Sequence, residues 1–152
     1  AMIGVPVCAE KFDFRPAPVI TGMRTNDSLA GSESYFFAEL KRLSHIIRQL
    51  KEGHTLYILL DEILKGTNSE DKHKGSLALI RQLLKFDCTA IIATHDLELS
   101  KLENEWPGKV KNYRFESYIE GDGLKFDYKI SEGFARNMNA TFLMKKMGII
   151  ES

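Results

Sequence analysis

The sequence predicts an α/β fold, with a parallel sheet flanked by helices and an antiparallel β-hairpin toward the C-terminal end. Two continuous apolar runs of strand length, residues 55–60 and 89–94, enclose a segment with helical apolar spacing. A strand, a helix and a second strand within roughly 40 residues form a βαβ unit, whose strands are parallel. Farther on, two loosely alternating segments flank Gly121-Asp122-Gly123, a pattern typical of a hairpin turn.

Length and composition fit one globular domain and exclude several classes of protein. The chain has 152 residues, 43% of them hydrophobic, and its 21 basic and 21 acidic side chains give a formal net charge of zero. A neutral chain argues against a surface that as a whole coats nucleic acid. No apolar run approaches the roughly 18 residues of a membrane span, and no signal peptide is visible. Cys8 and Cys88 lie far apart without a CxxC pattern, which favours reduced, buried thiols over disulfides.

The N-terminal third predicts one short strand and one helix. Pro6 makes residues 5–12 an edge strand or a loop, residues 19–23 are a strand candidate, and the polar residues 24–34 predict a loop. Residues 35–50 change to helical spacing, and Gly53 is a typical helix-ending residue. The apolar positions of this helix are Phe36, Phe37, Leu40, Leu43, Ile46, Ile47 and Leu50.

The remaining elements follow in order. Because residues 55–60 show no alternation, we expect that strand to be buried on both faces. The next helix begins at Asp71 or a neighbour, and residues 89–94 form the second strand. Residues 110–119 and 124–130 form the hairpin, and Asn139 caps a last helix over residues 140–147 that Gly148 ends.

Two adjacent carboxylates, Asp61 and Glu62, end the first continuous apolar strand. At the carboxyl end of a parallel strand, such side chains face the crevice where α/β folds bind ligands. An apolar strand followed by Asp-Glu is the Walker B pattern, in which the first carboxylate holds Mg²⁺ and the second orients or deprotonates water. The alternative interpretation is a strand end followed by a helix cap.

The second apolar strand ends in Ala93-Thr94-His95, which places an imidazole beside the same crevice. A lone histidine at a strand end is usually a surface residue, but its pairing with Asp-Glu at the matching strand end favours a functional role. Between the two strands, Gly66 permits a tight turn, and Thr67, Asn68 and Ser69 add hydrogen-bonding groups. Directly after a Walker B strand, this loop resembles the D-loop of ATPases that dimerise across nucleotide.

Together these motifs resemble the ATPase domain of MutS-type DNA mismatch repair proteins. The ordered motifs are Leu60-Asp61-Glu62-Ile63, Lys65-Gly66-Thr67 and Ala93-Thr94-His95, and Ser34-Tyr35-Phe36 with Glu39 resembles the family's signature segment. The resemblance covers nearly the whole chain and implies a P-loop NTPase-like, ABC-type sheet. It also implies ATP and Mg²⁺ as cofactors, a homodimer formed through the ATPase domain, DNA binding through regions outside this chain, and a cytoplasmic, nucleoid-associated location without a membrane.

The resemblance also implies residue roles. Asp61 would complete the Mg²⁺ shell, Glu62 would activate water, and His95 would sense the γ-phosphate. Ser34 would reach across the dimer to the partner's nucleotide. The loop residues Gly66, Thr67, Asn68 and Ser69 would touch the opposite protomer's site.

The sequence departs from the family pattern in several ways: Tyr35 stands where the family usually has Thr, and Glu33 replaces a commonly basic or small residue. Lys72-His73-Lys74 lengthens the loop after Asp71, and no G-x-x-x-x-G-K-S/T phosphate-binding motif occurs in the 152 residues. We therefore interpret residues 1–152 as the C-terminal portion of a MutS-type ATPase domain that lacks the Walker A segment. On this interpretation the chain alone has little ATPase activity, and the bared flank of its sheet promotes self-association.

Two alternatives remain open. A head domain of another ABC-type ATPase, SMC- or RecF-like, would carry a Gly-Gly-rich signature before the Walker B strand, whereas this chain has only Gly31 there. The Gly-Thr of the D-loop also favours MutS. A non-enzymatic interaction module on the same fold would not need Asp61, Glu62 and His95, and nucleotide binding with an upstream segment restored would decide between them.

Overall fold

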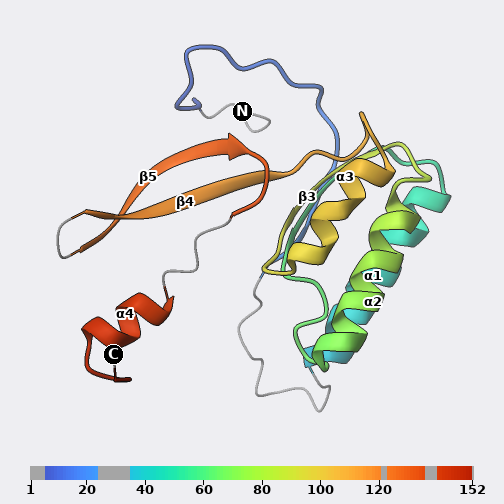
Figure 1. The fold of residues 1–152 in the computed structure, drawn as a ribbon. Coiled ribbons are helices and arrows are strands. Elements are labelled where there is room, and N and C mark those ends of the chain that lie inside the picture. Colours follow the sequence, from blue (N-terminus) through green and yellow to red (C-terminus); the bar gives the residue numbers. More distant parts are fainter. Residues whose placement is uncertain (1–5, 24–34, 121–122, 136–139, 152) are drawn as a thin grey trace. The chain divides into compact units, whose positions relative to one another are not determined.

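A computed structural model describes the chain except for residues 1–5, 24–34, 121–122, 136–139 and 152 (Figure 1). The chain divides into two compact units, Ala1–Asp96 and Leu97–Ser152, each with its own sheet. Within the described residues, every helix is too short or too polar to cross a membrane.

The first unit is a three-stranded parallel sheet with two helices, as the apolar pattern predicts. The strands lie in the order β1-β2-β3, with Gly22 opposite Leu60 and Asp61 opposite Ala93. The elements in chain order are β1 (Val19–Gly22), α1 (Tyr35–Lys51), β2 (Leu56–Asp61), α2 (Ser69–Leu83) and β3 (Cys88–Ala93). Residues 6–18 form no strand, so the loop interpretation of this segment holds for its described part.

The core lies on one face of β2, and the expectation that both faces are buried was wrong. Leu56, Ile58 and Leu60 are buried and alternate with half-buried residues. Ile46 and Leu50 of α1 and Leu83 of α2 share one buried cluster with these side chains, so both helices cover the same face. Figure 1 shows α1 and α2 along the same side of the strands.

Local sequence signals fix the helix ends. His54 N–H donates to Gln49 O at 3.1 Å and Gly53 N–H to Leu50 O at 3.1 Å, while Gly53 has a φ of +87°, which is a Schellman ending for α1. Helix α2 begins at Ser69, because the Asn68 side chain accepts a hydrogen bond from Asp71 N–H at 2.9 Å. Lys72-His73-Lys74 therefore lies within α2, and the prediction that these residues lengthen a loop was wrong.

The second unit contains the expected hairpin and C-terminal helix. Its elements are η1 (Leu97–Lys101), α3 (Leu102–Glu105), β4 (Tyr113–Glu120), β5 (Gly123–Glu132) and α4 (Ala140–Lys146). Strands β4 and β5 pair antiparallel, with Ile119 opposite Leu124. Helices η1 and α3 were not predicted from the sequence, although their buried Leu99 and Leu102 carry an apolar signal.

Four further predictions concern individual residues. Gly148 ends α4 with a φ of +68°, as predicted. Asn139 and Gly121-Asp122 lie outside the described residues. Both cysteines are free thiols, but Cys8 is exposed and Cys88 only half-buried, so the expected burial was wrong for Cys8. Burial raises the pKa of the Cys88 thiol, and the neighbouring Asp87 charge raises it further.

Candidate active site at the carboxyl ends of the parallel strands

The parallel register brings Asp61, Glu62 and His95 together at the carboxyl ends of β2 and β3. Asp61 pairs with Ala93, and Glu62 N–H donates to Ala93 O at 2.9 Å, so β2 and β3 end together. As a result Glu62 Oε1 lies 3.8 Å from His95 Nε2. This separation is too long for a hydrogen bond, so the two side chains are close neighbours that are not bonded to each other. The structure thus brings together the carboxylate pair and the histidine that the sequence analysis selected.

Two lysines lie against the carboxylate pair. Lys65 Nζ lies 3.3 Å from Asp61 Oδ2 and 3.7 Å from Glu62 Oε2, and Lys72 Nζ lies 3.6 Å from Glu62 Oε1. The Glu62 side chain is 25% exposed and that of Asp61 42%, so these charge contacts are only partly screened by water. The site therefore balances two carboxylates with two ammonium groups.

The turn after β2 has an unusual backbone. Glu62 has a φ of +53° and Leu64 a φ of +58°, both in the left-handed region that non-glycine residues rarely adopt. Leu64 N–H donates to Glu39 Oε1 of α1 at 2.7 Å, and the side chains of Ile63 and Leu64 are buried. Such residues persist only where the surrounding structure over-determines them, and they cluster at functional sites.

Two glycines allow this turn to pack closely against the helices. A Cβ on Gly66 would lie 2.8 Å from Phe36 Cβ in the first turn of α1. A Cβ on Gly75 of α2 would lie 2.3 Å from Leu64 Cδ1. Gly66 was predicted to permit a tight turn, and its close approach to Phe36 of α1 is the physical reason that the structure gives for a glycine here.

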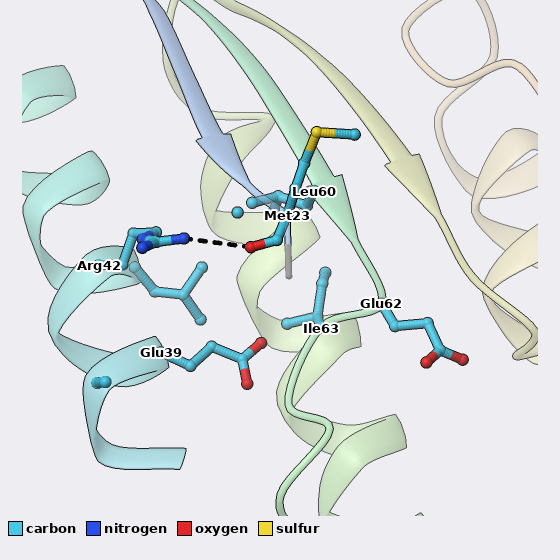
Figure 2. Close-up of a pocket in the computed structure, with 9 residues that line it drawn as sticks. Met23, Glu39, Arg42, Leu60, Glu62 and Ile63 are labelled. Atoms are coloured by element: carbon cyan, nitrogen blue, oxygen red, sulfur yellow. Dashed lines mark hydrogen bonds between the residues drawn. The ribbon is translucent and has the colours of Figure 1, made fainter. Parts of the chain in front are cut away.

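A pocket lies between α1 and the end of β2 (Figure 2). Arg42 Nη1 donates to Met23 O at 3.5 Å and lies 3.4 Å from Thr21 O, which ties α1 to the end of β1. Figure 2 shows the Glu62 carboxylate pointing away from Glu39 and Arg42. Glu62 is nevertheless one of the residues that line this pocket, so the pocket adjoins the turn that bears the Glu62 carboxylate.

The predicted D-loop residues have local roles in the structure. Asn68 Nδ2 donates to Asp71 Oδ2 at 2.8 Å, in addition to the cap that its Oδ1 provides, and Ser69 is the first residue of α2. Asn68 thus uses its side chain to begin the helix. Ser34, the predicted cross-dimer residue, lies outside the described residues.

Comparison with known proteins identifies the family of the chain. The family MutS domain V matches residues 1–149. The chain belongs to the MutS family. It is 32% identical over 131 residues to the DNA mismatch repair protein MutS of Thermotoga maritima, a region that covers 86% of this chain and 16% of that protein. It is 30% identical over 146 residues to the human MutS protein homolog 4, covering 91% of this chain and 15% of that protein. The chain spans about one-sixth of the length of these curated relatives.

The donor set of this MutS domain V chain fits magnesium brought by a nucleotide better than a metal held by protein alone. Among the described residues, no group of three or more His, Cys, Asp or Glu side chains is placed to hold a metal. Mg²⁺ at nucleotide sites commonly takes one or two carboxylates and completes its shell with water and phosphate oxygens. Asp61, half-exposed at a strand end, carries carboxylate oxygens of the kind that such a site uses.

Sequence reasoning did not identify a second pair at this edge. His73 Nδ1 lies 2.7 Å from Asp96 Oδ2, joining α2 to the segment after β3. Asp96 N–H in turn donates to Thr94 Oγ1 at 3.0 Å. The only signals for these residues were that Asp96 follows His95 and that Lys72-His73-Lys74 departs from the family pattern. Neither signal specifies a contact between distant segments.

Proposed function

We propose that this chain is the catalytic portion of the ATPase domain of a MutS-like DNA mismatch repair protein. The observation that carries the proposal is the approach of Glu62 and His95 to 3.8 Å at the ends of adjacent parallel strands of a MutS domain V chain. Mismatch repair is the function that the names of its relatives state. The MutS assignment replaces the alternative of an SMC- or RecF-like head.

Each residue of the site has a chemical task in ATP hydrolysis. Bound Mg-ATP would supply an electrophilic γ-phosphorus, and its metal would help to neutralise the negative charge of the phosphate oxygens. Asp61 contributes the protein ligand to that Mg²⁺. Glu62 accepts the proton of the attacking water, and His95 donates a hydrogen bond to the γ-phosphate. Lys65, in contact with both carboxylates, keeps them close together before ligand binds.

The proposal extends to parts outside the described site. Residues 1–152 act as the C-terminal portion of a P-loop NTPase-like, ABC-type domain, and a Walker A segment from outside this sequence completes the phosphate site. Ser34 and the loop Gly66, Thr67, Asn68 and Ser69 contact the nucleotide of a partner protomer. ATP turnover then changes the DNA-clamping state of the dimer, whose DNA contacts lie outside this chain.

The test compares Glu62→Gln with the parent in a longer protein that contains this chain and an upstream phosphate-binding segment. Removing a general base slows proton transfer about 10²- to 10⁴-fold, so steady-state ATP hydrolysis should fall by that order while ATP binding stays intact. Glu52→Gln is the matched control, because Glu52 is an exposed partner of Gln49 beyond the end of α1. The 152-residue chain alone should hydrolyse ATP very slowly.

Unchanged turnover in Glu62→Gln would remove Glu62 from its proposed role. Failure of the longer protein to bind ATP at all would favour the non-enzymatic interaction module. Rapid, Glu62-dependent hydrolysis by the 152-residue chain alone would contradict the need for an outside phosphate-binding segment.

A further inference from the structure

Two adjacent residues of α2 contact two different strand ends of the candidate site. Lys72 Nζ lies 3.6 Å from Glu62 Oε1, one residue beyond β2, and His73 Nδ1 lies 2.7 Å from Asp96 Oδ2, three residues beyond β3. Neighbouring positions on an α-helix point about 100° apart, so one turn of α2 can reach the ends of two strands that lie about 4.8 Å apart. The two contacts connect α2 to the two segments that bear Glu62 and His95.

These contacts are protected enough to hold a geometry. The side chains of Lys72 and Glu62 are 28% and 25% exposed, and those of His73 and Asp96 are 36% and 21% exposed. Fully exposed ion pairs contribute little, whereas partial burial and a 2.7 Å contact give a defined arrangement. Helix α2 also holds Lys72 and His73 rigidly, because both residues follow the Asn68 cap within the first turns of this 15-residue helix.

His95 needs such support. Its side chain is 94% exposed, so packing does not fix the imidazole, and the backbone around it must do so. The hydrogen bond from Asp96 N–H to Thr94 Oγ1 closes a short turn with His95 in its middle. The Asp96 side chain then anchors this turn to His73 of α2.

We propose that Lys72 and His73 are positioning residues for the candidate active site. Lys72 orients the Glu62 carboxylate directly, and His73 orients His95 through Asp96 and the Thr94–Asp96 turn. This proposal rests on the proposed function, since it assigns Glu62 and His95 their catalytic roles. It assigns roles to Lys72 and His73, which lie next to each other in α2, and none to Lys74.

The first experiment measures the geometry in the 152-residue chain. Two-dimensional NMR spectra of His73→Ala should show shifted or broadened backbone signals for His95 and Asp96, and faster amide exchange at Asp96. His73→Asn should restore the parent signals, because the Asn amide nitrogen can occupy the place of Nδ1. Asn is no better a helix former than Ala, so restoration cannot come from a more stable helix. His54→Ala is the control, since the side chain of His54 lies 3.8 Å from that of exposed Glu52, away from the candidate site.

The second experiment measures ATP hydrolysis in the longer protein used above. Misplacement of a catalytic group by about 1 Å can reduce a rate about 10²-fold, so His73→Ala and Lys72→Ala should lower kcat about 10- to 100-fold with KM for ATP within twofold. His73→Asn should recover most of the kcat. Lys74→Ala is the matched control on the same helix, because Lys74 Nζ pairs with exposed Glu70 at 2.5 Å.

The outcomes separate this inference from the proposed function. If Glu62→Gln abolishes hydrolysis but His73→Ala and Lys72→Ala behave like Lys74→Ala, the positioning role is wrong and the proposed function stands. Unchanged His95 and Asp96 signals in His73→Ala would also overturn the positioning role. If Glu62→Gln leaves hydrolysis unchanged, the proposed function itself fails, and the catalytic significance of both residues fails with it.

Discussion

At the scale of single residues, the turn after β2 shows how the chain holds a costly backbone at its candidate site. A non-glycine residue in the left-handed region costs about 1–3 kcal/mol, and Glu62 and Leu64 both adopt that region. Glu62 N–H is held by Ala93 O, and Leu64 N–H is held by Glu39 Oε1. The direction in which Glu62 points is therefore set from β3 on one side and from α1 on the other.

Glu39 gives the first stability prediction. Glu39→Ala leaves the Leu64 amide, which lies in a buried turn, without its acceptor, and this should lower the free energy of unfolding by about 1–3 kcal/mol. Glu39→Gln should cost clearly less, because its amide oxygen can still accept the bond. The second carboxylate oxygen, Oε2, is buried without a hydrogen-bond partner among the described residues, so replacing it removes no bond seen there.

Urea unfolding followed by circular dichroism measures this difference, with Glu52→Ala as the control at an exposed position. Equal losses for Glu39→Ala and Glu52→Ala would show that the Leu64 contact contributes nothing. Equal losses for the Ala and Gln variants of Glu39 would show that hydrogen-bond acceptance is not its role.

Residue types at strand ends could be predicted from the sequence, but contacts between distant side chains could not. Asp61, Glu62 and His95 follow apolar runs, and parallel register then brings them together without further information. The His73–Asp96 contact depends on where α2 begins and which way each side chain points. The positive φ of Glu62 carries no sequence signal, because Gly or Asn is the usual residue at such a position.

At the scale of elements, hydrophobic periodicity predicts the long helices and the strands. It does not predict where a capped helix begins, nor the short helical turns. The predicted start of α2, Asp71 or a neighbour, is placed at Ser69 by the Asn68 cap. The short elements η1 and α3 carry only a few leucines, too few to show a 3.6-residue period. Asn112 Nδ2 donates to Ser100 O and to Glu103 Oε2, both at 2.8 Å. No sequence pattern predicts such side-chain contacts.

The cap at Asn68 gives the second stability prediction. Asn68→Ala should destabilise the chain by about 0.5–2 kcal/mol, because Asp71 N–H loses its acceptor at the start of α2. Asn68→Asp retains a capping oxygen and should stay close to the parent. Thermal unfolding of the three proteins measures the effect.

The same variants separate capping from the proposed contact with a partner's nucleotide. If capping is the whole role of Asn68, Asn68→Asp in the longer protein keeps parental ATP turnover. A stable Asn68→Asp protein with impaired turnover would instead support a direct ligand contact. An Asn68→Ala protein as stable as the parent would contradict the capping role.

At the scale of the molecule, the sheet of the first unit has two unequal faces. Leu56, Ile58 and Leu60 face α1 and α2, while Tyr57 and Leu59 point to the other face and are only half-buried. Their neighbours on that face are Val19, opposite Tyr57, and Ile91, opposite Leu59. An unbroken apolar run predicts a buried strand, but it does not state how many of its faces this chain itself covers.

Exposed apolar side chains on an edge strand lead to the last prediction, which concerns self-association. Ile91 is 66% exposed on β3, an edge of the described three-stranded sheet, and Val19 is 41% exposed on β1, the other edge. Apolar edges of this kind pair with other chains, so the 152-residue chain should form dimers or larger species in light scattering. Ile91→Lys should shift the population toward monomer, because a charged side chain on an edge strand opposes pairing.

Ile149→Lys is the matched control, since Ile149 is 60% exposed but lies outside any strand. A monodisperse monomer for the parent chain would contradict the prediction. An equal effect of both substitutions would show that net charge, not the β3 edge, controls association.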